Sequence, residues 1–141
     1  MKRYLVISGK DAFAQDRGKT DGSGRHSYAD LLIYVTKAAF EAGVIVDFFQ
    51  SDHEDEISWK IEFAHGMYDG VIINAAASAF TGDIIRDAIR ASDVPCVEVL
   101  LPDTLVCGES ILTRVCIRSI AGSGLGIYKE ALAALDAHSR K

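Results

Sequence analysis

Residues that could carry chemistry are concentrated in three polar segments of this chain. Each segment follows a short apolar run, and the segments cover residues 8–27, 74–81 and 100–113. The first is the richest, because it combines four glycines with seven Asp, Lys or Arg residues. At 20 residues it is longer than an ordinary connection, so we expect a lid or a binding loop rather than a simple link.

Several side chains in these segments could move protons or anchor a ligand. Asn74 is the strongest candidate, because an amide at the end of a buried strand can hold a ligand oxygen or an ordered water. The alternative for Asn74 is an amide that only ties down its own loop. Replacement acids, bases or anchors are offered by Asp11, Arg17, Lys19, Ser23, Asp103 and Glu109. For each of these six, the alternative is a loop side chain that contacts solvent alone.

An alternation of two hydrophobic patterns positions these groups. Short runs rich in apolar and β-branched residues predict strands at 4–7, 44–49, 71–74, 96–101 and 115–120. Apolar residues at helical spacing predict helices at 28–42, 56–67, 82–91 and 126–137. Continuously apolar strands joined by helices indicate a parallel, doubly wound α/β sheet. Ligands of such sheets bind beyond the carboxyl ends of the strands, where the three polar segments fall.

Composition limits the partners and the compartment. With 141 residues, of which 49% are hydrophobic, residues 1–141 are expected to form a single domain. A formal net charge of -5 with scattered basic residues argues against nucleic acid and membranes as partners. The first apolar run is too short for a signal peptide or a membrane span, so we expect a cytoplasmic protein.

The three cysteines do not indicate a metal site or a disulfide framework. Cys96 and Cys116 lie in apolar, strand-like runs and are expected to be small buried hydrophobic residues. Cys107 lies in a polar segment and stays a candidate reactive thiol, although no activating partner is visible in the sequence. Because the spacing matches no metal-ligand pattern, we expect no metal and no cofactor.

Motifs for nucleotides and phosphoryl transfer are incomplete. Residues 22–24 read Gly-Ser-Gly but lie far from the strand end that a dinucleotide fingerprint requires. Residues 18–20 match the end of a P-loop, but Phe13 stands where the first glycine of that motif belongs. A receiver-type phosphoryl acceptor would need an aspartate at the end of the third strand, where this chain has Asn74. The sequence therefore argues against these three classes of α/β protein.

A longer series of motifs resembles a known enzyme family. Residues 48–54 read FFQSDHE, 69–74 read DGVIIN, 86–88 read RDA and 95–99 read PCVEV, with Trp59 after the first motif. In this order and spacing they resemble the type II dehydroquinases. The resemblance implies a flavodoxin-like, three-layer αβα sandwich whose five-stranded parallel sheet has the order 2-1-3-4-5. It also implies a small-molecule ligand and homotrimers that assemble into a homododecamer.

The resemblance implies a reaction as well, but most positions that carry it are substituted. The family dehydrates 3-dehydroquinate through an enolate, using a tyrosine base, an arginine that activates it, an asparagine and a histidine acid. Here the tyrosine position is Ser23, the arginine position is Gly18 and the histidine position is Phe80. Asn74 alone is kept. Serine ionises less readily than tyrosine and phenylalanine has no proton to give, so we expect the family reaction to be nearly abolished.

Positions that bind substrate in the family depart from its pattern too. The family stretch EVHISN reads EVLLPD here, which places Leu100, Pro102 and Asp103 where two polar side chains and an asparagine are expected. An arginine expected four residues later is Cys107. The positions still expected to line a ligand pocket are Ser8, Lys19, Ser78, Phe80, Thr81, Asp87, Glu98, Leu100, Pro102, Asp103 and Cys107.

Buried charges and aromatic residues carry further expectations. Glu98 lies in a buried strand, so it should need a partner such as Arg86 or a loop cation. The resemblance places Asp87 at the trimer interface, and a surface pair with Arg86 is the alternative. Aromatic side chains expected in the core or at trimer contacts are Phe48, Phe49, Trp59 and Phe63.

Three functions remain open on the sequence. The chain could be a dehydroquinase-like lyase or isomerase that acts on another small cyclic or carbonyl compound, with catalytic groups among Asn74, Ser23, Arg17 and Asp11. It could be a non-catalytic homologue that binds a small molecule or serves as a scaffold. It could also retain dehydratase activity through other residues, such as Tyr28. We favour the first, because a scaffold gives little reason to keep a long loop rich in glycine and charge.

Overall fold

The computed structural model describes residues 1–13, 26–79, 81–101 and 109–140. The strands in this part of the chain are β1 (Arg3–Ser8), β2 (Ile45–Gln50), β3 (Gly70–Asn74), β4 (Cys96–Leu100) and β5 (Arg118–Ala121). The helices are α1 (Tyr28–Ala42), α2 (Glu54–Glu62), α3 (Asp83–Ala91), α4 (Gly126–Ser139) and the short 3₁₀ helix η1 (Ala76–Ala79).

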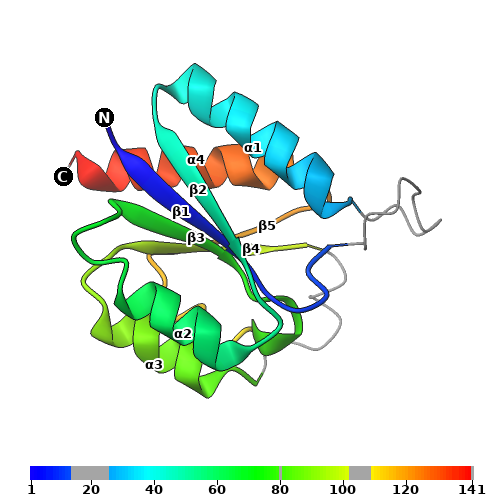
Figure 1. Ribbon diagram of the computed structural model, residues 1–141, viewed down its shortest axis with the longest axis vertical. Coiled ribbons are helices and arrows are strands. Elements are labelled where there is room, and N and C mark those ends of the chain that lie inside the picture. Colours follow the sequence, from blue (N-terminus) through cyan, green and yellow to red (C-terminus); the bar gives the residue numbers. More distant parts are fainter. Residues whose placement is uncertain (14–25, 80, 102–108, 141) are drawn as a thin grey trace.

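The strands form one parallel sheet, which confirms the predicted fold class. Their order is β2-β1-β3-β4-β5. Figure 1 shows α1 and α4 on one face of the sheet and α2 and α3 on the other. The chain passes from β1 to β2 on one side of β1 and then returns to β3 on the other side. A ligand crevice is therefore expected at the carboxyl ends of β1 and β3.

Alternate residues of the strands fill two hydrophobic clusters. Tyr4 and Val6 of β1 pack with α1 and α4, whereas Leu5 and Ile7 pack with α2 and α3. All four side chains are buried. The sheet therefore separates two cores, and the position of a residue in its strand decides which core its side chain enters.

Local signals explain why α1 begins and ends where the sequence predicts. The Ser27 hydroxyl accepts a hydrogen bond from the Asp30 backbone N–H at 3.0 Å, and the Asp30 carboxylate accepts one from the Ser27 N–H at 3.2 Å. Gly43 ends the helix in the left-handed region, with a φ of 73°. A capping box and a left-handed glycine cap thus fix both ends of the helix.

Two elements, α2 and β5, differ from their predicted bounds by more than two residues. Helix α2 covers Glu54–Glu62 rather than 56–67: acidic side chains in its first turn suit the helix dipole, and Gly66, with a φ of 83°, lies in the turn that follows. Strand β5 covers Arg118–Ala121 rather than 115–120. Val115 and Cys116 lie in a turn and a bend, not in a strand, although they pack against the α2/α3 cluster. Apolar content alone does not distinguish such a turn from a strand.

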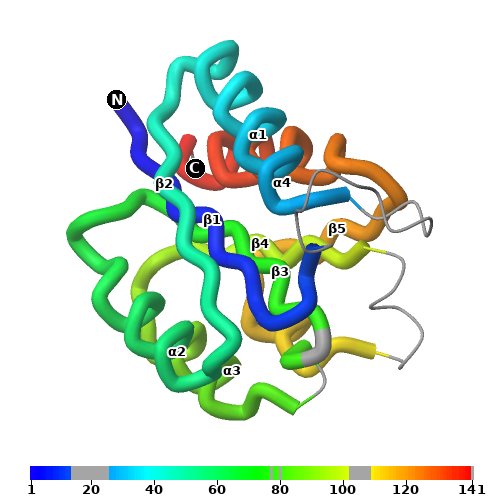
Figure 2. The backbone as a smooth tube through the Cα atoms, turned by 45° about the vertical axis from the view of Figure 1, so that its right-hand side comes forward, coloured from blue at the N-terminus to red at the C-terminus, as the bar shows by residue number. Residues whose placement is uncertain are grey.

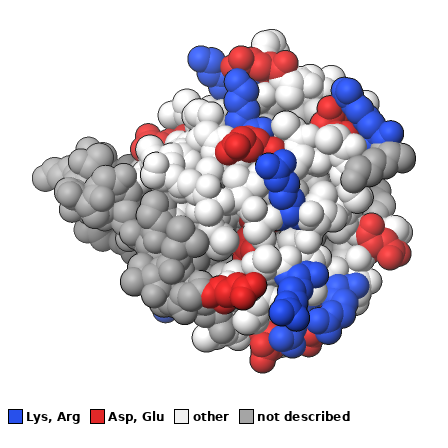
Figure 3. Space-filling view, turned by 180° about the vertical axis from the view of Figure 1, so that it is seen from behind, with Lys and Arg blue, Asp and Glu red and all other residues white. Residues whose placement is uncertain are grey.

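Acidic and basic side chains are interspersed on the face of the molecule seen in Figure 3. They do not form one patch of a single sign on this face, so it exerts little long-range attraction on polyanions. Within the described ranges, no helix is both long and apolar enough to cross a membrane.

Candidate functional site

Ser8 and Asn74 lie side by side at the carboxyl edge of the sheet. They end β1 and β3, and they are partners in the register of these two strands. Val6 and Ile72, two residues earlier, belong to the cluster beneath α1 and α4, so Ser8 and Asn74 face the same layer. Figures 1 and 2 show the loops that follow β1 and β3 at this edge. A hydroxyl and an amide therefore meet where a ligand is expected.

A glycine allows the two loops to approach each other. The Gly9 backbone N–H donates to the Asn74 carbonyl at 2.8 Å. A Cβ atom at position 9 would lie 2.7 Å from the Ala75 carbonyl oxygen, which is closer than real Cβ contacts come. Only glycine leaves room for this backbone contact.

Replacing Gly9 by alanine should therefore lower the free energy of unfolding by about 2 kcal/mol, because the new methyl would press on a backbone carbonyl. Gly124→Ala is the matched control, since a Cβ atom there meets nothing within 4 Å. The control should stay within about 0.5 kcal/mol of the unsubstituted protein in urea unfolding. Equal losses for the two variants would contradict the close approach at Gly9.

The Asn74 side chain has a fixed orientation. Its Oδ1 accepts a hydrogen bond from the Ala76 backbone N–H at 3.1 Å. Its Nδ2 is buried and donates to no described residue, and the Ser8 hydroxyl beside it likewise has no partner among the described residues. A buried donor without an acceptor costs about 1–3 kcal/mol, so this amide is poised for a ligand oxygen.

Strained backbone lies in both loops at this edge. Asp11 and Ala76 have φ values of 61° and 52°, in the left-handed region that costs a residue with a Cβ atom about 1–2 kcal/mol. Asp11 lies three residues after Ser8, and Ala76 lies two residues after Asn74. Strain of this kind is typical of functional sites.

Aromatic rings pack on the same side of the sheet. Tyr128 of α4 is completely buried, and the Phe13 ring lies 6.1 Å from the Tyr28 ring and 6.4 Å from the Tyr128 ring. Burial is the main cause that raises the pKa of Tyr128 far above its usual value; the Asn74 amide opposes the rise and Tyr28 adds to it. Burial also raises the pKa of Tyr28. Both phenols are therefore neutral at physiological pH, which does not favour Tyr28 as a substitute tyrosinate base.

Ser78 and Thr81 are tied to the start of α2. The Ser78 hydroxyl donates to Glu54 Oε2 at 2.9 Å, and the Thr81 hydroxyl donates to the same oxygen at 3.4 Å. These bonds attach the segment after β3 to the neighbouring helix. The two hydroxyls, predicted to contact a ligand, thus use their protons within the protein.

Glu98 lies on the opposite face of the sheet from Asn74. It pairs in register with Ile73, which belongs to the α2/α3 cluster. Glu98 is completely buried, and its carboxylate accepts hydrogen bonds from the hydroxyls of Ser110, Thr113 at 3.1 Å and Ser119 at 2.7 Å. Among the described residues, hydroxyl groups rather than a cation are therefore the partners of this buried carboxylate, and the loop cations predicted as an alternative in residues 14–25 lie outside them.

Arg86, the predicted partner of Glu98, is engaged elsewhere. Its guanidinium lies 3.3 Å from the Asp87 carboxylate and 3.5 Å from that of Asp83, all on α3. The prediction of an Arg86–Glu98 pair is therefore wrong. Asp87 is exposed on α3, in the layer opposite to the one that Ser8 and Asn74 face. A surface pair of this kind adds little stability.

The remaining predicted site residues are placed only in part. Leu100 is half-buried at the end of β4. Outside the described residues lie Arg17, Lys19, Ser23, Phe80, Pro102, Asp103 and Cys107. Tyr128 was not predicted as a site residue, because the apolar spacing of its helix assigns it to the core.

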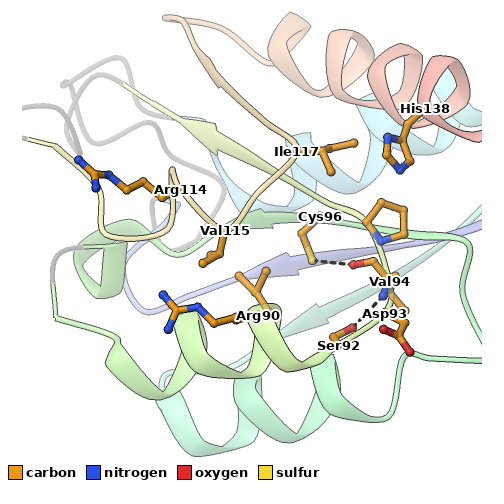
Figure 4. A pocket seen from close by; sticks show the side chains of 11 residues that line it. Arg90, Ser92, Asp93, Val94, Cys96, Arg114, Val115, Ile117 and His138 are labelled. Carbon is orange, nitrogen blue, oxygen red and sulfur yellow. Dashed lines mark hydrogen bonds between the residues drawn. The ribbon is translucent and has the colours of Figure 1, made fainter. Parts of the chain in front are cut away.

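A cavity of about 420 Å³ lies at the amino end of β4, away from the Ser8–Asn74 edge (Figure 4). Its lining includes Arg90, Arg114 and His138. The Cys96 thiol, also in the lining, donates to the Val94 carbonyl at 3.6 Å, and burial raises its pKa to about 12. The thiol is therefore protonated at neutral pH.

Native Cys96 should accordingly resist iodoacetamide at pH 8, because a thiol with this pKa is ionised in only about one molecule in 10⁴. Mass spectrometry of tryptic peptides gives the labelled fraction. The same protein in urea is the control, and there Cys96 should react fully. Rapid labelling of Cys96 in the native protein would contradict this burial.

Comparisons with known proteins match nearly the whole chain. A model of the dehydroquinase class II family matches residues 2–136. A 3-dehydroquinate dehydratase of Campylobacter lari is 37% identical, over 94% of this chain and 86% of its own length. One of Caldicellulosiruptor bescii is 36% identical, over 96% of this chain and 97% of its own. The crystal structure of a type II dehydroquinase from Butyrivibrio crossotus superposes with a TM-score of 0.84 at 26% identity, covering 96% of this chain and 97% of that chain.

Proposed function

Because the chain belongs to the type II dehydroquinase family, we propose that it binds a small cyclic carbonyl compound at Ser8 and Asn74 and promotes proton transfer next to the carbonyl. The reaction is of the lyase or isomerase type, on a compound other than 3-dehydroquinate. One observation carries the proposal: the Asn74 amide nitrogen is a buried donor, held in place through Ala76, with no acceptor among the described residues.

A buried amide donor suits this chemistry. When a proton is removed next to a carbonyl, the carbonyl oxygen gains negative charge, and a fixed donor in a dry site stabilises that charge more strongly than water does. The Ser8 hydroxyl, paired in register with Asn74, can supply a second hydrogen bond. The removal of the proton also needs a base, and Asp11, in the strained loop after Ser8, is the carboxylate that we propose for it.

The substituted positions of the family pattern are the reason to propose a different substrate. Ser23, Gly18 and Phe80 replace the base, its activator and the acid that the resemblance implies. A reaction that needs only proton removal and enolate stabilisation keeps the amide and dispenses with the acid for a leaving hydroxyl.

Two other functions have specific support. A binding protein without catalysis is favoured by the neutral character of Ser8, Asn74 and Tyr128, since such groups hold a ligand without transferring its protons. Retained dehydration is favoured by the 37% identity to the relative from Campylobacter lari, which is named 3-dehydroquinate dehydratase.

Proton exchange in D₂O tests the proposed function. The protein is incubated with cyclohexanone, with 2-cyclohexenone and with 3-dehydroquinate, and NMR follows the signal of the protons next to each carbonyl. Protein-dependent exchange without loss of a hydroxyl group supports the proposal. Binding without any exchange would contradict the proposal and favour a binding protein without catalysis. Formation of a conjugated enone from 3-dehydroquinate would contradict it and favour retained dehydratase activity.

We further propose that the chain forms homotrimers that assemble into a homododecamer and that α2 lies at a contact between subunits. Three large apolar side chains on α2 and the turn after it are exposed: Trp59 at 57%, Phe63 at 72% and Met67 at 61%. Trp59 and Phe63 therefore do not belong to the core. Exposed apolar groups that lie close together typically mark an interaction surface.

Replacing Phe63 by glutamate should lower the mass of the assembled protein measured by light scattering during gel filtration, because a charge would enter an apolar contact. The circular dichroism spectrum should stay unchanged, since Phe63 contributes little to the core of one subunit. Lys37→Glu, at an exposed position on α1, is the control and should leave the mass unaltered. An unchanged mass for Phe63→Glu would place the interface elsewhere.

A further inference from the structure

Tyr128 brings a third polar atom to the point where Ser8 and Asn74 meet. Its ring lies in the cluster beneath α1 and α4, which also holds Val6 and Ile72 of β1 and β3. Its hydroxyl is close enough to the Asn74 amide for that amide to lower its pKa. A hydrogen-bonding contact with Asn74 lowers the pKa of Tyr128, but it falls outside the geometry of a formed hydrogen bond, so both the Tyr128 hydroxyl and Asn74 Nδ2 lack such a bond among the described residues.

The unpartnered atoms of the described residues are concentrated here. Four buried side-chain polar atoms lack a hydrogen bond in the described ranges, and those of Ser8, Asn74 and Tyr128 account for three of them. The fourth is the hydroxyl of Tyr4, near the amino end of β1. Because most buried polar atoms are paired, three exceptions at one edge of the sheet indicate a site that a ligand completes.

We propose that Tyr128 is a ligand-binding residue whose hydroxyl donates a hydrogen bond to the ligand oxygen that the Asn74 amide also holds. The ligand class is a small molecule with a carbonyl or hydroxyl oxygen that accepts two hydrogen bonds. This inference rests on the proposed function for the place of binding, but it requires no catalysis.

The chemistry of the phenol fits a donor. Burial raises the pKa of Tyr128, so the hydroxyl keeps its proton and cannot act as the tyrosinate base that the family resemblance places at Ser23. Phe13 is half-buried and packs against both Tyr128 and Tyr28. Displacement of the Phe13 ring is the change among the described side chains that we expect to admit a ligand.

Two tyrosine variants test the inference. Tyr128→Phe removes the hydroxyl at the site, and Tyr4→Phe removes the other unpartnered tyrosine hydroxyl of the same core as a matched control. Urea unfolding is measured without ligand, and calorimetry measures the binding of 3-dehydroquinate and of cyclohexanone. Tyr128→Phe should leave the unfolding midpoint unchanged or raise it, and it should weaken the binding of a probe about tenfold. Tyr4→Phe should leave the affinity unchanged.

Each outcome separates this inference from the proposed function. A lower midpoint for Tyr128→Phe with unchanged affinity would overturn the inference, because the hydroxyl would then serve the fold. Binding that depends on Tyr128, without proton exchange, would support the inference and reject the proposed catalysis. Proton exchange that is insensitive to Tyr128→Phe would reject the inference alone. If neither probe binds the unsubstituted protein, both are overturned.

Discussion

Replacing Glu98 by alanine should lower the free energy of unfolding by about 4 kcal/mol. The carboxylate is completely buried and accepts hydrogen bonds from Ser110, Thr113 and Ser119. Removing it leaves these hydroxyls without their acceptor and opens a cavity among β4, β5 and the segment that contains Ser110. Urea unfolding followed by circular dichroism measures the loss.

Two further variants serve as comparisons for the Glu98→Ala measurement. Glu98→Gln keeps the shape and one acceptor oxygen, so it should lose less than the alanine variant, about 1–2 kcal/mol. Glu130→Ala, at an exposed position on α4, should change the stability by less than about 0.5 kcal/mol. A loss below about 1 kcal/mol for Glu98→Ala would mean that the hydroxyl cluster contributes little and that its groups find other partners.

Replacing Asn74 by alanine should reduce ligand-dependent proton exchange about 10²-fold, because it removes the donor proposed to hold the reacting oxygen. The variant should also lose about 1–2 kcal/mol of stability, since the Ala76 N–H loses its acceptor. Proton exchange by NMR and urea unfolding measure the two effects separately.

Two further variants, Asn74→Asp and Gln50→Ala, distinguish the loss of the amide donor from the loss of the acceptor for the Ala76 N–H. Asn74→Asp keeps an oxygen for the Ala76 N–H but removes the free donor, so exchange should fall while this backbone contact stays. Gln50 carries an exposed amide at the end of β2, beside Ser8 in the register, and its replacement should change neither quantity. Exchange that survives in both Asn74 variants would show that the amide does not hold the reacting oxygen.

The fold could be predicted from the sequence because its signals are local and repeated. Capping residues and a left-handed glycine fix α1, and the strand order follows from the resemblance to the family. The ends of α2 and β5 could not be predicted as well. Val115 and Cys116 are partly buried and pack against the α2/α3 cluster from an irregular segment, and the apolar pattern of the sequence does not distinguish that segment from a strand.

The candidate site could be predicted only in part. Ser8 and Asn74 follow from the rule that ligands bind at the carboxyl ends of parallel strands, and the structure places them together. The partners of Glu98 could not be deduced, because a buried carboxylate is expected to pair with a cation. In the structure, three hydroxyls from distant positions in the sequence donate hydrogen bonds to it instead. Tyr128 could not be identified either, since a tyrosine at a core position of a helix gives no sign of an unpaired hydroxyl.

Turnover of 3-dehydroquinate is the most direct test of our proposal that this family member acts on another compound. The purified protein is incubated with 3-dehydroquinate, the ultraviolet absorbance of the conjugated enone product is followed, and the relative from Campylobacter lari serves as the positive control. We predict no enone above the background of the uncatalysed reaction, because the motif resemblance places the family's base, activating arginine and acid at Ser23, Gly18 and Phe80. Turnover at a rate similar to that of the relative would contradict the proposal and show that other residues of this chain carry out the dehydration.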